Sequence, residues 1–448
     1  MAIYRRARSI LGLVPVLALL GLLPLQTQAA EPDAAALALL RQDQAKHISL
    51  LGLDRWQSLG YRGQGIKIAV LDTGFRGYRD QLAKTLPTKV ETRCFRDDGN
   101  FEAKNSQHGL LCAEVLHTLA PQADLLLATW EPDSSESFLE AVRWAKHAGA
   151  RIISCSIIMP SWSDGNGGGE FHQKLSRILQ GYNPSDLSFS ARGMKRGIAD
   201  EPTGLGHTLF FACAGNTALR HWTGPFHAGK DGLQEWEFGH TANPVKPWGR
   251  ERVSVELYGA KDTQYEIAVR DERGQEISRS RPFPGRDSSS IAARFIPLPQ
   301  STYYAQVRRL HGQLGKFHLV VLGGTLGTVT SQGSVACPAD GPEVIAVGAM
   351  TPTGRRLDYS ACGLDSQILK PDFVAPVPFP ITLRSQSFTG TSAAAPQAAA
   401  LAAVLWSQHP NWNAEQVHTA LIKCSRDVGS PGPDCETGHG MIALPETP

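Results

Sequence analysis

Short apolar runs and amphipathic stretches alternate along most of the chain. Residues 66–71 form a nearly continuous apolar run rich in β-branched side chains, which predicts a buried strand. Similar strand patterns occupy 124–129, 151–159, 208–214 and 344–349, whereas helical spacing occurs in 111–119, 137–147 and 393–406. This alternation predicts an α/β fold, a mostly parallel sheet with helices on both faces.

The segment 217–333 has a different pattern, in which apolar and polar residues alternate in short runs. The alternating apolar positions include Val253, Val255, Leu257, Tyr265, Ile267, Val269, Phe317, Leu319 and Val321. Turn-forming stretches such as 271–274 separate these runs. The pattern predicts an inserted antiparallel β-sandwich-like domain. Two interpretations remain open, a stabilising insertion and a substrate-binding module.

The first thirty residues have the pattern of a secretory signal peptide. Three arginines precede an apolar stretch, 10–25, and small residues follow at 26–30. We therefore expect cleavage after Ala29 or Ala30, with an uncleaved amino-terminal anchor as the alternative. Cleavage implies a secreted or periplasmic protein with no stable membrane association after signal removal.

These patterns divide the chain into four parts. Residues 1–30 are the expected signal peptide and 31–49 a short linker. The α/β domain is expected over 50–216 and 334–445, with the β-rich insertion at 217–333 between its two halves.

The composition gives no support to a nucleic-acid partner and makes disulfides possible. The formal net charge is only +2 and no dense basic run occurs, so a nucleic-acid partner has no support. Export would permit disulfides among the eight cysteines. The loop between Cys424 and Cys435 favours that pair, and Cys337 with Cys362 is a second candidate. Cys112, Cys155 and Cys213 lie in apolar runs and are expected to be buried thiols.

Four polar residues stand at predicted element boundaries. Asp72 ends the first strand pattern, His108 opens a helical one, and Asn216 follows the strand pattern 208–214. Ser392 opens the helical run 393–406, where the helix dipole favours a developing anion. Each residue alone could cap a turn or a helix. Together they supply a nucleophile, a base, an orienting acid and an oxyanion donor.

The motifs around these residues resemble those of the subtilisin-like serine proteases, the subtilases. The resemblance rests on Asp72-Thr73-Gly74, His108-Gly109, Gly215-Asn216 and Gly390-Thr391-Ser392-Ala393, in that chain order. It implies a catalytic triad of Asp72, His108 and Ser392, with Asn216 in the oxyanion hole. It also implies that Ser156, Ile157, Ile158 and Gly215 bind a protein or peptide substrate. No cofactor and no metal site is expected.

Several positions depart from the family pattern. Leu110 and Glu114 replace smaller or polar residues in the His108 helix, and Ile158 and Met159 stand where the family has glycines. The segment 31–49 is also too short for the folded pro-domain that many secreted subtilases carry. Three functions therefore remain: a secreted serine endopeptidase, a catalytically weak subtilase-fold protein that binds peptides or proteins, and esterase or transfer chemistry on the same triad.

Overall fold

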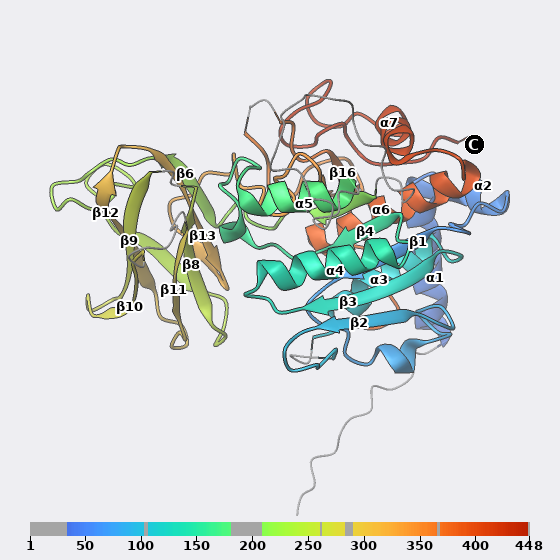
Figure 1. Ribbon diagram of the computed structural model, residues 1–448, viewed down its shortest axis with the longest axis horizontal. Coiled ribbons are helices and arrows are strands. Elements are labelled where there is room, and N and C mark those ends of the chain that lie inside the picture. The colour runs from blue at the N-terminus through green and yellow to red at the C-terminus, as the bar shows by residue number, and fades with distance from the viewer. Residues whose placement is uncertain are drawn as a thin grey trace, which may run out of the picture.

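A seven-stranded parallel sheet organises the larger part of the computed structural model (Figure 1), which describes residues 34–102, 106–180, 208–259, 262–282, 290–364 and 368–446. The strand order is β16-β15-β5-β4-β1-β3-β2. The strands are β1 (Lys67–Leu71), β2 (Glu91–Phe95), β3 (Asp124–Trp130), β4 (Ile152–Cys155), β5 (Leu209–Cys213), β15 (Ile345–Met350) and β16 (Phe373–Pro376). Each neighbouring pair is parallel, which confirms the predicted α/β fold.

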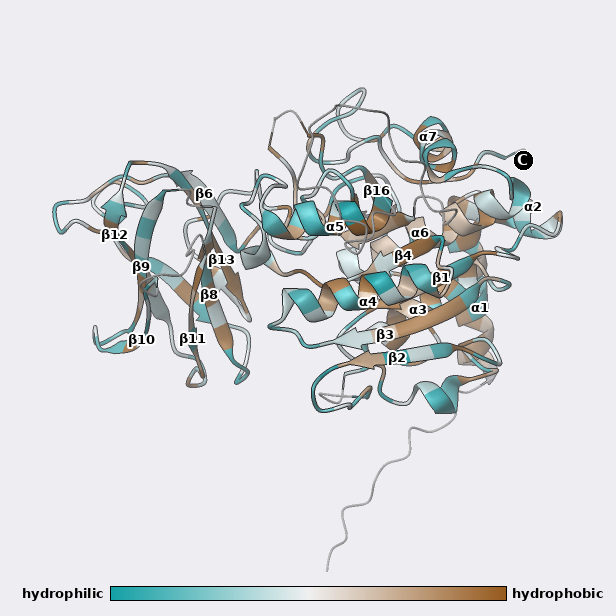
Figure 2. Ribbon diagram, viewed as in Figure 1, coloured by the Kyte–Doolittle hydropathy of each residue, from teal (hydrophilic) through white to brown (hydrophobic). Residues whose placement is uncertain are grey.

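Helices cover both faces of this sheet because its strands are apolar on both sides. In β1, Ile68 and Val70 belong to one buried cluster and Ala69 and Leu71 to the other. The first cluster contains side chains of α3 (His108–Leu119), α6 (Thr391–Gln408) and α7 (Ala414–Cys424). The second contains those of α4 (Ser135–His147) and α5 (Glu170–Gln180). Hydrophilic and hydrophobic residues alternate along α4 and α5, as expected for helices with one face in solvent (Figure 2).

Some elements differ from the sequence-based expectation. β4 ends at Cys155, so only the first half of the predicted strand 151–159 lies in the sheet. The sheet also contains β2 and β16, which the pattern did not reveal. β2 is an edge strand with no fully buried side chain, and β16 has four residues; neither gives a strong periodic signal.

The expected linker 31–49 is instead largely helical. It forms α1 (Ala34–Leu50), which continues into the short helix α2 (Leu53–Ser58). His47 Nε2 lies 2.8 Å from Gln397 Oε1 on α6, and Gln44 Nε2 donates to the Pro380 carbonyl at 3.2 Å. This segment is therefore part of the folded domain. The expected signal peptide lies outside the described residues. Among the residues described, no helix is both long and apolar enough to cross a membrane.

The insertion forms two antiparallel sheets around a core of its own, as predicted (Figure 1, left). One sheet contains β10 (Glu276–Ser280), β9 (Thr263–Asp271), β12 (Tyr303–Gly312), β7 (Asn243–Pro247) and β14 (Gly324–Leu326). The other contains β11 (Ile291–Phe295), β8 (Val253–Tyr258), β13 (Lys316–Leu322) and β6 (His221–Pro225). In Figure 1 the second sheet is the one that faces the α/β domain.

The two disulfides considered from the sequence are not formed. All eight cysteines lie in the described part of the chain, and no disulfide joins any of them. The Cys362 thiol donates to the Ser331 carbonyl at 3.0 Å, and the amide of the next residue, Gly363, donates to the Cys435 carbonyl at 2.8 Å. The fold thus brings Cys435 toward Cys362, which proximity in sequence to Cys424 could not reveal.

Candidate active site

The predicted site residues converge at the carboxyl edge of the parallel sheet. Asp72 directly follows β1, Ser156 directly follows β4, and Asn216 lies just beyond β5. These three strands are neighbours in the sheet, so their carboxyl ends deliver the three side chains to one region. His108 is the first residue of α3, and Ser392 is the second residue of α6.

Asp72 and His108 form a close pair. His108 Nδ1 lies 2.7 Å from Asp72 Oδ2, while the Thr73 amide donates to Oδ1 at 2.8 Å. The Asp72 side chain is fully buried, and that of His108 is 29% exposed. Burial lowers the pKa of His108, but the charge and hydrogen bond of Asp72 outweigh it, so the net pKa is raised. The carboxylate therefore orients the ring and stabilises its charged form.

Gly109 is required for this approach of α3 to β1. A Cβ on Gly109 would lie 2.6 Å from Cε1 of Phe75 and 2.7 Å from Cβ of Asp72. Both distances are well below van der Waals contact. The His108-Gly109 motif thus has a packing reason in addition to a chemical one.

Ser392 is held by Ser156 through two reciprocal hydrogen bonds. Ser156 Oγ donates to the Ser392 carbonyl at 3.0 Å, and Ser392 Oγ donates to the Ser156 carbonyl at 3.3 Å. The hydroxyl therefore bonds to Ser156 and not to His108 in this structure. The hydroxyl must give up this hydrogen bond to the Ser156 carbonyl before His108 can accept its proton.

Asn216 presents its amide nitrogen to the serine loop. Its Oδ1 accepts hydrogen bonds from the amide and the hydroxyl of Thr391, both at 3.0 Å. This fixes Nδ2 as the end that faces Gly390, where φ is +88° and a Cβ would lie 2.9 Å from Nδ2. The amide group is thus preorganised as a donor beside Ser392. The role of Thr391 gave no signal in the sequence beyond its position next to the serine.

The predicted substrate strand runs beyond the end of β4. Ser156 is buried, while Ile157 and Ile158 are half-buried and line a cavity that also reaches Thr73. A Cβ on Gly215 would contact Cγ2 of Ile158 at 3.6 Å, so this side chain lies over Gly215. Ile158 therefore occupies space beside Gly215 that a glycine at position 158 would leave open. Met159 is largely buried, and its amide donates to the Cys337 carbonyl at 2.7 Å.

A loop before α6 adds side chains that the sequence did not assign to the site. Phe388 meets the His108 ring edge-on at 5.7 Å, and Arg384 lies 5.7 Å from the Phe388 ring. The positive charge of Arg384 acts to lower the pKa of His108. Glu114, expected only to add bulk and charge, accepts hydrogen bonds from the amides of Thr382 and Leu383 and so fastens this loop to α3.

A buried thiol lies beside Asp72 and Ser392. Cys112 Sγ lies 3.9 Å from Asp72 Oδ2 and 3.7 Å from the Ser392 carbonyl. Burial and the charge of Asp72 raise the pKa of this thiol well above its usual range. Cys112 therefore stays protonated and packs between α3 and α6, in agreement with the expectation of a buried thiol.

Two groups of described side chains have donor types that bind metals. Asp72, His108 and Cys112 form one group, but the first two already bond to each other. His172, Cys337 and Asp340 form the other. Burial lowers the pKa of His172, but hydrogen bonds to Asp340 and Glu343 raise it to about 9. A metal would have to displace that proton, so we assign a metal to neither group.

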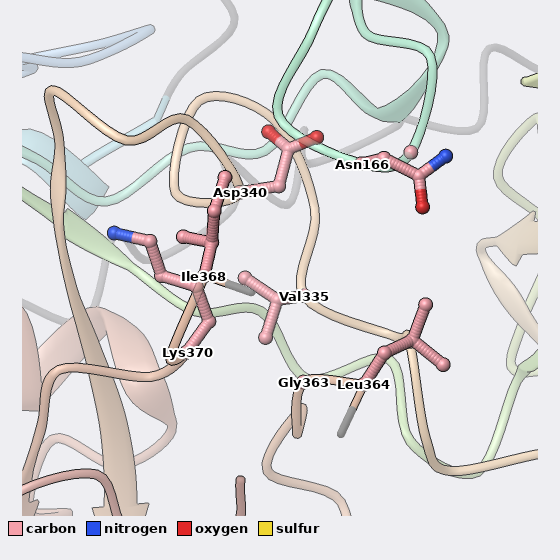
Figure 3. A pocket seen from close by; sticks show the side chains of 9 residues that line it. Asn166, Val335, Asp340, Gly363, Leu364, Ile368 and Lys370 are labelled. Atoms are coloured by element: carbon pink, nitrogen blue, oxygen red, sulfur yellow. The ribbon is translucent and has the colours of Figure 1, made fainter. Parts of the chain in front are cut away.

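A separate cavity of about 280 Å³ is lined by residues other than Asp72, His108, Asn216 and Ser392 (Figure 3). No triad residue lines it, and its apolar side chains include Val335, Leu364 and Ile368. Its charged groups have partners outside it: Asp340 bonds to His172, and Lys370 bonds to Asp372 at 2.8 Å. The two charged side chains of the cavity are therefore already paired.

Comparison with known proteins identifies the family. The model of the subtilase family matches residues 63–245 and 300–440. The chain belongs to the subtilase family. Residues 246–299 of this subtilase, which the family model does not match, lie inside the insertion. Subtilisin DY of Bacillus licheniformis is 31% identical over 111 residues, which cover 25% of this chain and 40% of that protein. A subtilisin of Bacillus pumilus is 32% identical over 107 residues, covering 24% and 38%.

The chain thus matches less than half the length of these curated relatives. Among solved structures, the CspB protease of Clostridium perfringens has a TM-score of 0.60 and 14% identity, and the alignment covers 89% of this chain and 97% of that one. At this identity the likeness concerns the fold, and it extends over nearly the whole subtilase chain.

Proposed function

We propose that this subtilase is a secreted serine endopeptidase that hydrolyses peptide bonds through Asp72, His108 and Ser392. The observation that carries the proposal is the 2.7 Å bond between His108 Nδ1 and the buried Asp72 carboxylate, at the sheet edge where α6 presents Ser392. A buried carboxylate on one ring nitrogen leaves the other nitrogen free to act as a base.

In the proposed reaction, Ser392 Oγ leaves the Ser156 carbonyl and attacks the carbonyl carbon of the substrate. His108 accepts the hydroxyl proton and then gives it to the departing amine, which breaks the C–N bond and leaves an ester on Ser392. Water, deprotonated by His108, attacks the ester; the C–O bond to Ser392 breaks, and His108 returns the proton to the departing Oγ, which releases the acid product. Asp72 stabilises the imidazolium in both steps.

Asn216 Nδ2 and the Ser392 amide would bind the oxyanion. The alignment of Asn216 by Thr391 supports this role, because a donor fixed before the reaction costs no reorganisation. In subtilisin, a carboxamide in this role contributes about 2.7–4 kcal/mol to transition-state stabilisation.

A second candidate is a catalytically weak subtilase-fold protein that binds peptides or proteins. The bond from Ser392 Oγ to the Ser156 carbonyl and the position of Ile158 over Gly215 favour it. The same observations, in an active enzyme, predict a groove that accepts only a small side chain next to the scissile bond. Secretion or periplasmic location rests on the pattern of residues 1–30.

The test is cleavage of casein and a diverse peptide library by the purified mature protein, followed by mass spectrometry. The proposal predicts defined peptide-bond cleavage that Ser392→Ala abolishes, with small residues such as Ala, Gly or Ser preferred next to the scissile bond. Binding of peptides without cleavage by a folded, monodisperse protein would instead support the second candidate.

A further inference from the structure

A cavity of about 540 Å³ lies beside the triad, between the α/β domain and the insertion. One wall is the segment 157–162, joined by Thr73 and Asp133. Ile157 directly follows Ser156, which is bonded to Ser392, and Thr73 directly follows Asp72. The cavity is therefore lined by the residues that directly follow Asp72 and Ser156 in the chain, and it extends to the insertion.

The other wall is the polar face of the insertion's four-stranded sheet. Along β8, Val253, Val255 and Leu257 point into the core of the insertion, so the alternate residues point the opposite way. Those alternate residues, Arg252, Ser254 and Glu256, line the cavity, as do Arg294 on β11 and Leu322 on β13. Ser254 is 8% and Glu256 5% exposed, so the α/β domain covers this face.

Two arginines stand out on this wall. Arg294 is paired with Ser254 across β11 and β8, and Arg252 lies two residues before Ser254, so both share the cavity face. Both side chains are exposed, and within the described ranges neither guanidinium has an ion-pair or hydrogen-bond partner. By contrast, Arg270, Arg279 and Arg281 on the insertion bond to Glu266 or Glu276.

The acidic groups of the cavity do not neutralise the positive charge of Arg252 and Arg294. Glu256 is buried and accepts a hydrogen bond from Ser254 Oγ at 2.9 Å, so part of its hydrogen-bonding capacity as an acceptor is already used within the wall. The two arginines outnumber it on that wall. Asp133 belongs to the opposite wall, which comes from the α/β domain. An extended peptide between the walls presents alternate side chains to each of them.

We propose that Arg252 and Arg294 form a substrate subsite that binds an acidic side chain of the peptide. This side chain belongs to the part of the peptide that lies along residues 157–162. This inference rests on the proposed protease function and gives the insertion a part in substrate recognition. The planar guanidinium group favours a carboxylate because it can donate two parallel hydrogen bonds to it.

The first test compares hydrolysis of peptides that differ only in Glu, Gln or Lys at one of the six positions around the scissile bond. We expect the wild type to favour Glu over Gln at one position by about tenfold or more in kcat/KM, a charge-assisted contact being worth roughly that much. In the double variant Arg252→Ala/Arg294→Ala, the ratio of kcat/KM for the Glu peptide to that for the Gln peptide should fall to about one. Arg273→Ala, an exposed arginine on another turn of the insertion, should keep it.

The second test measures binding without catalysis. The full-length Ser392→Ala variant is equilibrated with acidic, neutral and basic peptide pools, and bound peptides are identified by mass spectrometry. Enrichment of acidic peptides that disappears in Ser392→Ala/Arg252→Ala/Arg294→Ala supports the subsite, even if the wild type proves unable to cleave. Cleavage or binding with no acidic preference, or a preference that survives the arginine substitutions, overturns it.

Discussion

Ser156 and Ser392 exchange two hydrogen bonds, one from each hydroxyl to the carbonyl of the other residue. The pair joins the end of β4 to the start of α6 and fixes the main chain at Ser392. It also holds the Ser392 hydroxyl in a hydrogen bond that the hydroxyl must give up before His108 can accept its proton. This relationship leads to the first prediction.

Replacing Ser156 by Ala should lower both stability and turnover. The half-buried Ser392 carbonyl loses its hydroxyl donor, which costs about 1–3 kcal/mol of unfolding free energy. Because the start of α6 loosens, kcat should fall more than KM changes. Urea unfolding and steady-state kinetics measure the two effects. Ser154→Ala is the matched control: this buried hydroxyl on β4 has no hydrogen-bond partner, so its removal should leave both quantities nearly unchanged.

The acid limb of the pH profile should reflect the Asp72–His108 pair. Catalysis needs neutral His108, and the net effect of its surroundings raises its pKa above 6.5. We therefore expect kcat/KM to rise with pH and to reach half its maximum above pH 6.5. Arg384→Ala removes a charge that lowers this pKa, so the midpoint should move to higher pH. A midpoint below 6.5, or a shift to lower pH in the variant, would contradict this description of the pair.

A second histidine should make stability depend on pH. His172 on α5 bonds to Asp340 at 3.0 Å and to Glu343 at 2.8 Å, with a pKa of about 9 in place of the ordinary 6.5. Because the folded pKa is the higher one, this stabilisation is fully present below about pH 6.5 and is lost as the pH rises through about 9. The difference corresponds to about 3 kcal/mol.

His172→Gln should therefore reduce the unfolding free energy more at pH 6 than at pH 9.5. Urea denaturation of wild type and variant at the two pH values gives the comparison. The exposed His147 serves as control, and His147→Gln should have the same small effect at both pH values. An equal loss at both pH values for His172→Gln would mean that the ring contributes through packing and not through its charge.

Gly109→Ala should disturb the site through packing alone. The new Cβ would meet Phe75 and Asp72 well inside van der Waals contact, so α3 must move away from β1. We expect a loss of about 1–3 kcal/mol in unfolding free energy, together with a lower kcat, because His108 moves with the helix. Gly249→Ala, where a Cβ meets open space, should change stability by less than about 0.5 kcal/mol. Equal stability of the two variants would refute the close-packing argument.

The sequence revealed Asp72, His108, Asn216 and Ser392 because each stands at the boundary of a strongly periodic element. Parallel strands place their carboxyl ends on one edge, so boundary positions translate into proximity. The parts it did not reveal depend on tertiary contacts. The Ser156–Ser392 exchange requires two particular side-chain rotamers, and the role of Thr391 requires that α6 lie against Asn216.

Other features were not predicted from the sequence for similar reasons. α1 is rich in alanine and leucine, so its helical character was detectable. Its docking, however, depends on the contact between His47 and Gln397, which are far apart in the sequence. The disulfide predictions relied on distance along the sequence, whereas Cys435 lies near Cys362 through folding. The wall formed by Arg252 and Arg294 becomes visible only when the insertion is placed against the α/β domain.

The central claim is that Ser392 is a nucleophile activated by His108, and reaction with a fluorophosphonate probe tests it most directly. Wild-type protein should incorporate one probe per molecule on Ser392, located by mass spectrometry. Ser392→Ala should incorporate none, and His108→Ala should react at least about a hundredfold more slowly, as expected for loss of general-base catalysis. A folded wild-type protein that stays unlabelled, or that labels equally fast without His108, would contradict the proposed triad.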